Sequence, residues 1–327
     1  MSTRVKLSVS LGDYDINRAI IDGRVQPPGV ELLPLVQTSP ERHWRMLVHR
    51  EFDVCELSMG SYVAMHGRDG APDFVAIPVF PHRRFRHSYV FVTGARPIGS
   101  ASDLRGGRIG IRSWQVTGGV WMKGFLADHH QLPLDSVTWV AQDPDDVDVE
   151  LPPGVHLERV PEGETVTGLC ARGELDGLLY PEIPEQVHAG TGEILRLFPD
   201  FRAAEESYYA ATGIFPIMHV VVLRRELAEQ HPWLARSLYE AFTESKRLSM
   251  ERMRDPRVVS LAWLRWLIEH ERELLGPDPW EYGLSSANRH NLDTFLRYAH
   301  EQGLVGGRIR SEDLFLPSVV SDPPTFV

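Results

Sequence analysis

A short segment of the chain concentrates basic side chains. Residues 82–87 (HRRFRH) carry three guanidinium groups and two imidazoles around one phenylalanine. Guanidinium groups bind carboxylates through paired hydrogen bonds, so a cluster of this kind can hold an anionic ligand. Because Phe85 stands among the arginines, alternate side chains should point inward and outward. We therefore expect Arg83, Arg86 or both to face a ligand; the alternative is a solvated turn.

Two histidines are candidate proton donors. His87 ends the basic cluster, and His219 enters an apolar stretch after Gly213 and Pro216. An imidazole exchanges protons near neutral pH and can act as a general acid or base. Each histidine lies at one of two segments that are expected to cross between the halves of the molecule, so both can face one cleft. The alternative for each is a buried structural histidine.

Two carboxylates and a phenol extend this set. Glu56 and Glu182 are candidate general bases or hydrogen-bond acceptors, although each also fits an ordinary surface carboxylate. Tyr14 lies in the polar turn after the first expected strand and is a further candidate for substrate binding.

Four hydroxyl-bearing residues, Ser58, Ser61, Ser113 and Thr117, stand at turns that lead from a strand into a helix. Free backbone N–H groups and the helix dipole favour an anion at such a turn. In alternating α/β folds these turns lie at the carboxyl ends of strands, where ligands bind. Ordinary helix capping also explains these residue types, and both roles can hold together.

The elements that must position these residues alternate between strands and helices. A first unit has the order strand, helix, strand, helix, strand, and a second unit begins near residue 95. The expected strands are 6–10, 30–35, 52–57, 74–80, 88–93, 108–111, 156–159, 177–180 and 217–223. The expected helices are 17–22, 39–48, 62–66, 117–128, 165–172, 227–248, 258–275 and 291–302.

This order predicts an α/β protein with two lobes hinged over a cleft, in which strands 88–93 and 217–223 cross between the lobes. Each lobe would be a mixed sheet flanked by helices. Residues 1–93 would form the first part of lobe I, residues 94–212 lobe II, and residues 213–327 the second part of lobe I with C-terminal helices. The binding site would lie between the lobes.

Composition excludes several classes of protein. The chain has 327 residues, 43% hydrophobic and 24% charged, which is typical of a globular protein and excludes disorder, collagen and coiled coil. A net charge of -11 argues against a nucleic-acid partner, because phosphate binding needs a basic face. No apolar run approaches the roughly 18 residues of a membrane span, and no signal-peptide core is evident. We expect a cytoplasmic protein, with homo-oligomerisation left open.

Cysteine usage and motifs give no sign of a cofactor. The two cysteines, Cys55 and Cys170, lie in apolar runs and predict reduced, buried thiols. The chain lacks a CxxC pair, an HExxH helix, an EF-hand loop, GxGxxG, a phosphate-binding loop and a GxSxG elbow. We therefore expect no cofactor and no metal, although scattered His and Glu side chains can in principle assemble a metal site.

Several segments together resemble the 4,5-dihydroxyphthalate decarboxylase family over nearly the whole chain. They are FPHRRFRHS at 80–88, DLRGGRIGIRSWQVT at 103–117, TGIFPIMH at 212–219, HPWLARSLYEAF at 231–242 and WEYGL at 280–284. The resemblance implies a type 2 periplasmic-binding-protein-like fold, a cytoplasmic location, and conversion of 4,5-dihydroxyphthalate to protocatechuate and carbon dioxide. The chain departs from the family pattern at Glu182, where many relatives carry a basic residue after the proline. An acid there would weaken binding of a dianion, and the alternative is that Glu182 pairs with a phenol, an amine or a cation.

The leading hypothesis is a cofactor-independent decarboxylase that acts on 4,5-dihydroxyphthalate or a related hydroxylated aromatic carboxylate. The arginines of the basic cluster would orient carboxylates, the hydroxyl-bearing turns would supply further donors, and His219 or His87 would protonate the ring carbon. One alternative is a non-catalytic intracellular protein that binds a small carboxylate. Another is a lyase or hydrolase acting on a related carboxylate, since fold alone does not decide function.

Overall fold

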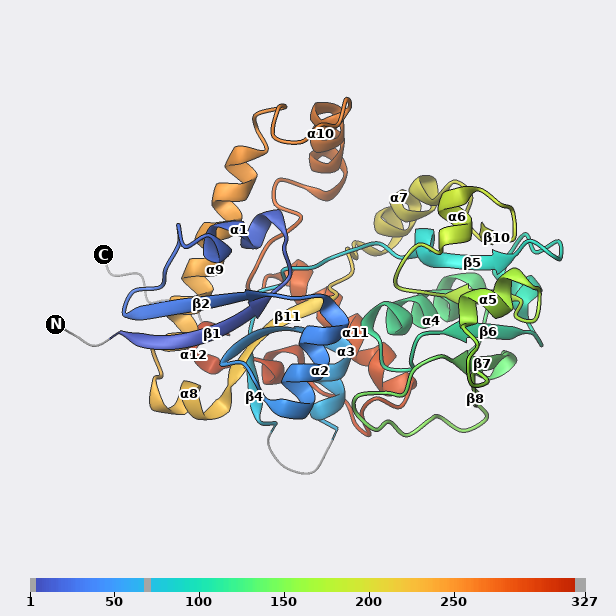
Figure 1. Cartoon of the computed structure of the whole chain (residues 1–327), viewed down its shortest axis with the longest axis horizontal. Helices are drawn as coiled ribbons and strands as arrows, with labels where there is room; N and C mark the ends of the chain where they lie inside the picture. Colours follow the sequence, from blue (N-terminus) through green and yellow to red (C-terminus); the bar gives the residue numbers. More distant parts are fainter. Residues whose placement is uncertain (1–3, 68–71, 321–327) are drawn as a thin grey trace.

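Two mixed sheets, one in each of two lobes, form the framework of the protein (Figure 1). The computed structural model describes residues 4–67 and 72–320. In Figure 1, lobe I carries the blue strands with orange and red helices, whereas lobe II is green to yellow. The chain therefore leaves lobe I once and returns to it. This arrangement confirms the two-lobed α/β fold expected from the sequence.

The sheet of lobe I has the strand order β2-β1-β3-β11-β4. Its strands are β1 (Val5–Leu11), β2 (Val30–Val36), β3 (Val54–Ser58), β4 (Phe74–Ile77) and β11 (His219–Arg224). β1 runs parallel to β2 and β3, whereas β11 runs antiparallel to β3 and β4. Every residue of β3 is buried, which places Glu56 inside the lobe. β4 is shorter than expected because Pro78, which has no N–H, follows it.

The sheet of lobe II has the strand order β10-β5-β9-β6-β7-β8. Its strands are β5 (Val90–Thr93), β6 (Arg108–Ile111), β7 (Thr138–Ala141), β8 (His156–Arg159), β9 (Gly177–Leu179) and β10 (Ile194–Arg196). β6 runs parallel to β7 and β9, and β5 is antiparallel to β9 and β10. β7 was not among the strands expected from the sequence.

Helices cover both sheets and continue to the C-terminal part of the chain. Those of the first part of lobe I are α1 (Arg18–Ile21), α2 (Ser39–His49) and α3 (Met59–Met65). Lobe II contains α4 (Thr117–His130), α5 (Val166–Ala171), α6 (Glu185–Ala189) and α7 (Phe201–Thr212). The later helices are α8 (Arg225–Gln230), α9 (Leu234–Arg252), α10 (Leu264–Leu275), α11 (Ser286–Glu301) and α12 (Pro317–Val320). α11 contacts both α3 and α4 and so ties the lobes together.

Two segments cross between the lobes and pair with each other. One leads from β4 to β5 and the other from α7 to β11, and Arg83 forms an isolated antiparallel bridge with Ile217 between them. The N–H of Met218 donates to the carbonyl of His82 at 2.9 Å. β5 itself belongs to the lobe II sheet, so the chain enters lobe II before residue 90 and not at residue 93. The loops that precede β5 and β11 make the crossing, and each strand stays within one sheet.

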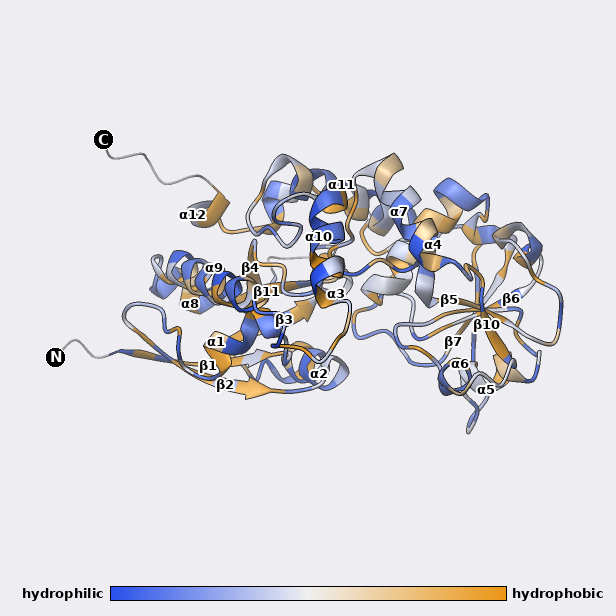
Figure 2. Ribbon diagram, turned by 90° about the horizontal axis from the view of Figure 1, so that it is seen from above, coloured by the Kyte–Doolittle hydropathy of each residue, from blue (hydrophilic) through white to orange (hydrophobic). Residues whose placement is uncertain are grey.

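The core is apolar in both lobes. Hydrophobic colour concentrates on the strands in Figure 2, while the outer helices are mixed. Trp114, Trp121 and Trp139 are among the largest fully buried side chains. The indole N–H of Trp121 donates to the carbonyl of Ile217 at 2.9 Å, so α4 supports the second crossing segment. Cys55 and Cys170 are buried free thiols, as expected.

Candidate functional site

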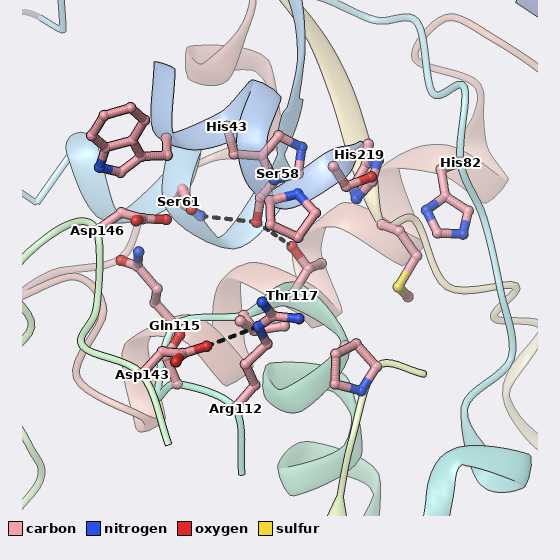
Figure 3. A pocket seen from close by; sticks show the side chains of 18 of the residues that line it. His43, Ser58, Ser61, His82, Arg112, Gln115, Thr117, Asp143, Asp146 and His219 are labelled. Atoms are coloured by element: carbon pink, nitrogen blue, oxygen red, sulfur yellow. Dashed lines mark hydrogen bonds and ion pairs between the residues drawn. The ribbon is translucent and has the colours of Figure 1, made fainter. Parts of the chain in front are cut away.

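A cavity of about 410 Å³ lies between the lobes and is lined by residues of both (Figure 3). Lobe I contributes α2, the start of α3 and the two crossing segments, and lobe II contributes the start of α4 and the loops after β6, β7 and β9. The residues expected from the sequence that line it are Ser58, Ser61, Arg86, Ser113, Thr117, Glu182 and His219. The two crossing segments therefore converge on one inter-lobe pocket.

The first turns of α3 and α4 meet at this cavity. Ser58 caps α3, and its Oγ lies 2.8 Å from Oγ1 of Thr117 (Figure 3). The N–H of Gly60 donates to the same Oγ1 at 2.9 Å. A Cβ on Gly60 would lie 2.2 Å from the carbonyl of Gln115, so only glycine allows this approach. The positive ends of two helices thereby face one small volume, which favours an anion.

The start of α4 keeps its donors available. Val116 occupies the N-cap position and makes no side-chain cap. The first backbone N–H groups of a helix have no partner inside the helix and are commonly satisfied by a side chain, water or a ligand. The N-terminus of α4 can therefore donate hydrogen bonds to a ligand in the cavity.

Arg86 is a buried cation beside this helix end, with only 5% of its surface exposed. Its Nε and one terminal nitrogen contact Sδ of Met218 at 3.2 and 3.1 Å, and the other terminal nitrogen donates to the carbonyl of Pro181 at 3.2 Å. No described carboxylate lies within ion-pair distance of it. Burial lowers the pKa of Arg86 to about 10, which still leaves it charged at neutral pH. Gly118 makes room for the guanidinium, because a Cβ there would lie 3.1 Å from Cζ.

A second cation, Arg112, is already paired. Its Nε lies 3.0 Å from Oδ2 of Asp143, and a terminal nitrogen lies 3.2 Å from Oε1 of Glu182. Asp146 lines the same side of the cavity (Figure 3). Desolvation by the surrounding chain raises the pKa of Asp146, the nearby carboxylates of Asp145 and Asp143 raise it further, and Arg112 opposes them. This side of the cavity is rich in hydrogen-bond acceptors.

His219 is held in place by a buried carboxylate. The register of β3 and β11 places Ser58 opposite His219 and Val221 opposite Glu56, so His219 and Glu56 are diagonal neighbours on one face of the sheet. Nδ1 of His219 lies 2.5 Å from Oε1 of Glu56. The carboxylate also accepts from the N–H of Gly12 at 2.8 Å. Because this contact engages Nδ1, Nε2 is the ring nitrogen left for a ligand.

Burial and nearby cations favour the neutral form of His219. Arg42, fully buried, pairs with Oε1 of Glu56 at 3.1 Å and donates to the carbonyl of the same residue at 2.9 Å. Burial, followed by the guanidinium groups of Arg42 and Arg86, lowers the pKa of His219 well below its ordinary value. With Nδ1–H donated to Glu56, the neutral ring presents Nε2 as an acceptor.

Two further imidazoles surround His219. The ring centroids of His43 and His82 lie 4.9 and 4.6 Å from that of His219 (Figure 3). Burial lowers the pKa of both residues well below the ordinary value, and the charge of His219 adds to this. Burial thus favours the neutral form of all three rings, and a proton on His219 would further disfavour protonation of His43 and His82.

Arg83 and His87 lie outside this cavity. Arg83 donates to Oδ1 of Asn288 at 2.5 Å and to the carbonyl of Glu281 at 2.8 Å, so its hydrogen bonds fasten the crossing segment to the C-terminal part of the chain. His87 stacks on Phe125 with ring centroids 4.2 Å apart. Burial, followed by His130 and His129, lowers the pKa of His87 to about 3. Neither side chain is among the described residues that line the inter-lobe cavity.

Glu56 and Tyr14 do not line the inter-lobe cavity but lie close to residues that do. Glu56 is fully buried and reaches the site through His219. Tyr14 lines a neighbouring cavity of about 730 Å³ that shares His82 with the site. Its ring centroid lies 5.7 Å from that of His82. Burial, and then the Glu56 carboxylate, raise the pKa of Tyr14 to about 12, so it is a neutral phenol at physiological pH.

Several lining residues were not singled out from the sequence. They are His43, His82, Arg112, Gln115, Asp143 and Asp146. His82 lies in the basic cluster, and His43 lies one helical turn after Ser39, on the same face of α2. Arg112 directly follows β6, at the carboxyl end of a parallel strand. These signals were present, but nothing local distinguished the residues from ordinary surface groups.

The described residues give no metal site and no membrane span. Within residues 4–67 and 72–320, no group of three or more His, Cys, Asp or Glu side chains is arranged to hold a metal ion. In the same ranges, no helix is both long and apolar enough to cross a bilayer.

Comparison with solved structures gives the fold. The periplasmic aliphatic sulphonate binding protein of Escherichia coli matches with a TM-score of 0.56 and 11% identity over 95% of this chain and 97% of that chain. The alkanesulfonate-binding protein of Xanthomonas axonopodis pv. citri, bound to MOPS, matches with a TM-score of 0.56 and 12% identity, covering 97% and 99%. The fold is thus of the type 2 periplasmic-binding-protein-like class.

Comparison of sequences gives the family. No protein-family model matches the chain. A 4,5-dihydroxyphthalate decarboxylase of Comamonas testosteroni is 37% identical over 324 residues, which cover 97% of this chain and 98% of the relative. A 4,5-dihydroxyphthalate decarboxylase of Pseudomonas putida is 36% identical over 214 residues, covering 64% and 83%. With a similar length and a match along almost all of it, the chain belongs to the 4,5-dihydroxyphthalate decarboxylase family.

Proposed function

We propose that this protein is a decarboxylase that removes carbon dioxide from 4,5-dihydroxyphthalate or a related hydroxylated aromatic acid bound in the inter-lobe cavity. The observation that carries the proposal is the position of Arg86 next to His219. Both line one cavity, and Arg86 contacts Met218, the residue before His219. A cation that has no carboxylate partner among the described residues and an ionisable ring thus line the same cavity.

The substrate carboxylate binds at Arg86 and the first turn of α4. A planar carboxylate matches the donor fork of a guanidinium, and the uncapped N–H groups of α4 add further donors. Gly118 lets both sources of hydrogen bonds approach the same oxygen atoms. Binding an anion here also acts on His219, because a negative charge nearby favours the protonated imidazole.

His219 then serves as the general acid. Its Nε2 gives a proton to the ring carbon that carries the carboxylate, while electrons from a ring hydroxyl stabilise the positive charge that develops in the ring. The bond to the carboxylate breaks, its electron pair restores the aromatic ring, and carbon dioxide leaves. His219 returns to the neutral state and takes its next proton from solvent. Glu56 holds Nδ1–H throughout and keeps the ring oriented.

Contacts between the lobes support this chemistry by closing the site. The hydrogen bonds of Ser58 and Gly60 with Thr117 join the start of α3 in lobe I to the start of α4 in lobe II. A closed cavity excludes water, which strengthens the pairing between Arg86 and the substrate and protects the reacting carbon.

The experiment is an incubation of the protein with 4,5-dihydroxyphthalate and a set of dihydroxybenzoates, with carbon dioxide and the ring product both measured. We expect carbon dioxide and product in equal amounts, and a loss of both in His219→Gln. The second candidate is a carboxylate-binding protein, favoured by the fold it has in common with sulphonate-binding proteins. Recovery of the bound acid intact, with no carbon dioxide, supports that candidate and refutes the decarboxylase.

A further inference from the structure

Two guanidinium groups line the cavity among the described residues, and they are held differently. Arg86 is 5% exposed and has no carboxylate partner in the described ranges. The side chain of Arg112 is 27% exposed and contacts two carboxylates, Oδ2 of Asp143 at 3.0 Å and Oε1 of Glu182 at 3.2 Å. A ligand carboxylate can therefore bind Arg86 directly, whereas it must compete for Arg112.

The competition for Arg112 is weak. The side chains of Asp143 and Glu182 are 42% and 55% exposed, so water solvates either carboxylate well once it is released. Ion pairs with such exposed carboxylates contribute little to stability. The two contacts also engage only two of the five N–H donors of the guanidinium. Arg112 can therefore direct donors toward a ligand with little loss of free energy.

Arg86 and Arg112 are neighbours on the cavity wall. A terminal nitrogen of Arg86 donates to the carbonyl of Pro181 at 3.2 Å, and Arg112 contacts the carboxylate of the next residue, Glu182. Burial lowers the pKa of Arg86, and the charge of Glu182 is among the groups that oppose this, so Glu182 acts on both guanidinium groups. Two consecutive residues thus lie against both guanidinium groups, and two carboxylates on one ring can meet them together.

We propose that Arg112 binds the substrate carboxylate that is retained in the reaction, exchanging Glu182 or Asp143 for it. This inference rests on the proposed function and adds a specificity-determining residue to it. The carboxylate that leaves binds at Arg86, and the carboxylate on the adjacent ring carbon meets Arg112. Because the ring is held at two points, it cannot rotate about a single contact. The carbon to be protonated therefore stays oriented toward Nε2 of His219.

This role of Arg112 gives the cavity a preference for acids with two neighbouring carboxylates. A monocarboxylate binds Arg86, where no carboxylate of the protein competes, and leaves Arg112 with its present partners. A dicarboxylate gains the second guanidinium as well. The ion pair of Glu182 with Arg112 also reduces the repulsion that the sequence predicted for a dianion, because an acid that is paired with a cation repels an anion less.

The test is calorimetric binding of 4,5-dihydroxyphthalate and 3,4-dihydroxybenzoate, which carry the same two hydroxyl groups and differ by one carboxylate. It uses the full chain with His219→Gln as the parent, so that turnover does not consume the ligand. We expect the dicarboxylate to bind at least about tenfold more tightly. Arg112→Met should weaken the dicarboxylate by at least about tenfold and change the monocarboxylate by less than about threefold. Arg108→Met removes another ion-paired arginine of the same strand, β6, outside the cavity, and should alter neither.

Glu182→Gln is a second test that does not depend on the folding of the Arg112 variant, because the Glu182 side chain is 55% exposed. Removing this competing carboxylate should tighten the dicarboxylate by about fivefold or more and the monocarboxylate by less than about threefold. An unchanged dicarboxylate affinity in Glu182→Gln overturns the inference, as do equal losses for both acids in Arg112→Met.

Carbon dioxide release is measured separately on the protein with His219 in place. Release from the dicarboxylate, combined with equal affinity for the two acids, overturns the inference and leaves the decarboxylase proposal intact. Preference for the dicarboxylate that depends on Arg112, without release of carbon dioxide, refutes the decarboxylase proposal and leaves the assignment of Arg112 intact.

Discussion

Replacing Arg86 with methionine should remove ligand binding while leaving the fold in place. The substitution keeps an unbranched side chain of similar length in a site that is 5% exposed. It loses the contacts of the guanidinium with Met218, with the carbonyl of Pro181 and with the ring of Tyr89. Removing one partner of a buried, hydrogen-bonded charge pair costs about 2–5 kcal/mol of binding. At about 1.4 kcal/mol per tenfold, the affinity should fall by about 30-fold to several thousand-fold.

Calorimetry with 3,4-dihydroxybenzoate measures this loss, and Arg83→Met is the matched control. Arg83 lies three residues away, is equally buried, and bonds to Asn288 and a carbonyl outside the cavity. Its loss leaves the Asn288 side chain with an unsatisfied acceptor and should lower stability by about 1–3 kcal/mol, with affinity changed less than about twofold. Equal affinity in Arg86→Met and the unchanged protein, or a larger loss in Arg83→Met, would refute the assignment of Arg86.

Three further predictions concern the histidines and the glycine beside Arg86. His219→Gln should lower turnover by about 10²- to 10⁴-fold without a matching loss of thermal stability. In the unchanged protein, kcat/KM should rise as pH falls from 8 to 6, because the reactive form of His219 is protonated and burial lowers its pKa. A flat pH profile would contradict this role. Because the folded pKa of His87 is about 3, the unfolded chain binds the extra proton between pH 6.5 and 3, and stability falls as pH falls through that window. His87→Phe should therefore reduce the stability lost between pH 7 and 5 by about 2 kcal/mol in chemical denaturation, and an unchanged loss would contradict the burial of a neutral ring. Gly118→Ala should raise KM several-fold, because the added Cβ displaces Arg86. The stability of the protein should stay the same or rise, because alanine favours the helix by about 1 kcal/mol relative to glycine. A lower stability with an unchanged KM would refute this prediction.

Local patterns in the sequence were sufficient to predict the fold and several of the residues that line the cavity. The turns at Ser58, Ser113 and Thr117 line the cavity because each ends a strand whose direction the α/β alternation fixes. The density of positive charge in residues 82–87 predicted that Arg83, Arg86 or both would face a ligand. The sequence could not separate it from Arg83, yet in an extended segment residues three apart face opposite sides.

Long-range pairing accounts for what the sequence could not supply. Glu56 and His219 meet because β3 pairs with β11, and 163 residues separate them in the chain. Nothing local shows that Glu56 is a buried partner of a histidine and not a surface carboxylate. Asp143 likewise joins the residues of lobe I at the cavity only because the two lobes meet there.

In the proposed mechanism, the central step is the transfer of a proton from His219 to the ring carbon, and one measurement tests it most directly. The protein is incubated in deuterated water with 4,5-dihydroxyphthalate labelled with carbon-13 in its carboxylates, and the products are followed by nuclear magnetic resonance. The account predicts labelled carbon dioxide together with 3,4-dihydroxybenzoate that carries one deuterium at the carbon that held the released carboxylate, and neither product with His219→Gln. Retention of the label in the intact acid, or equal conversion by His219→Gln, would contradict it.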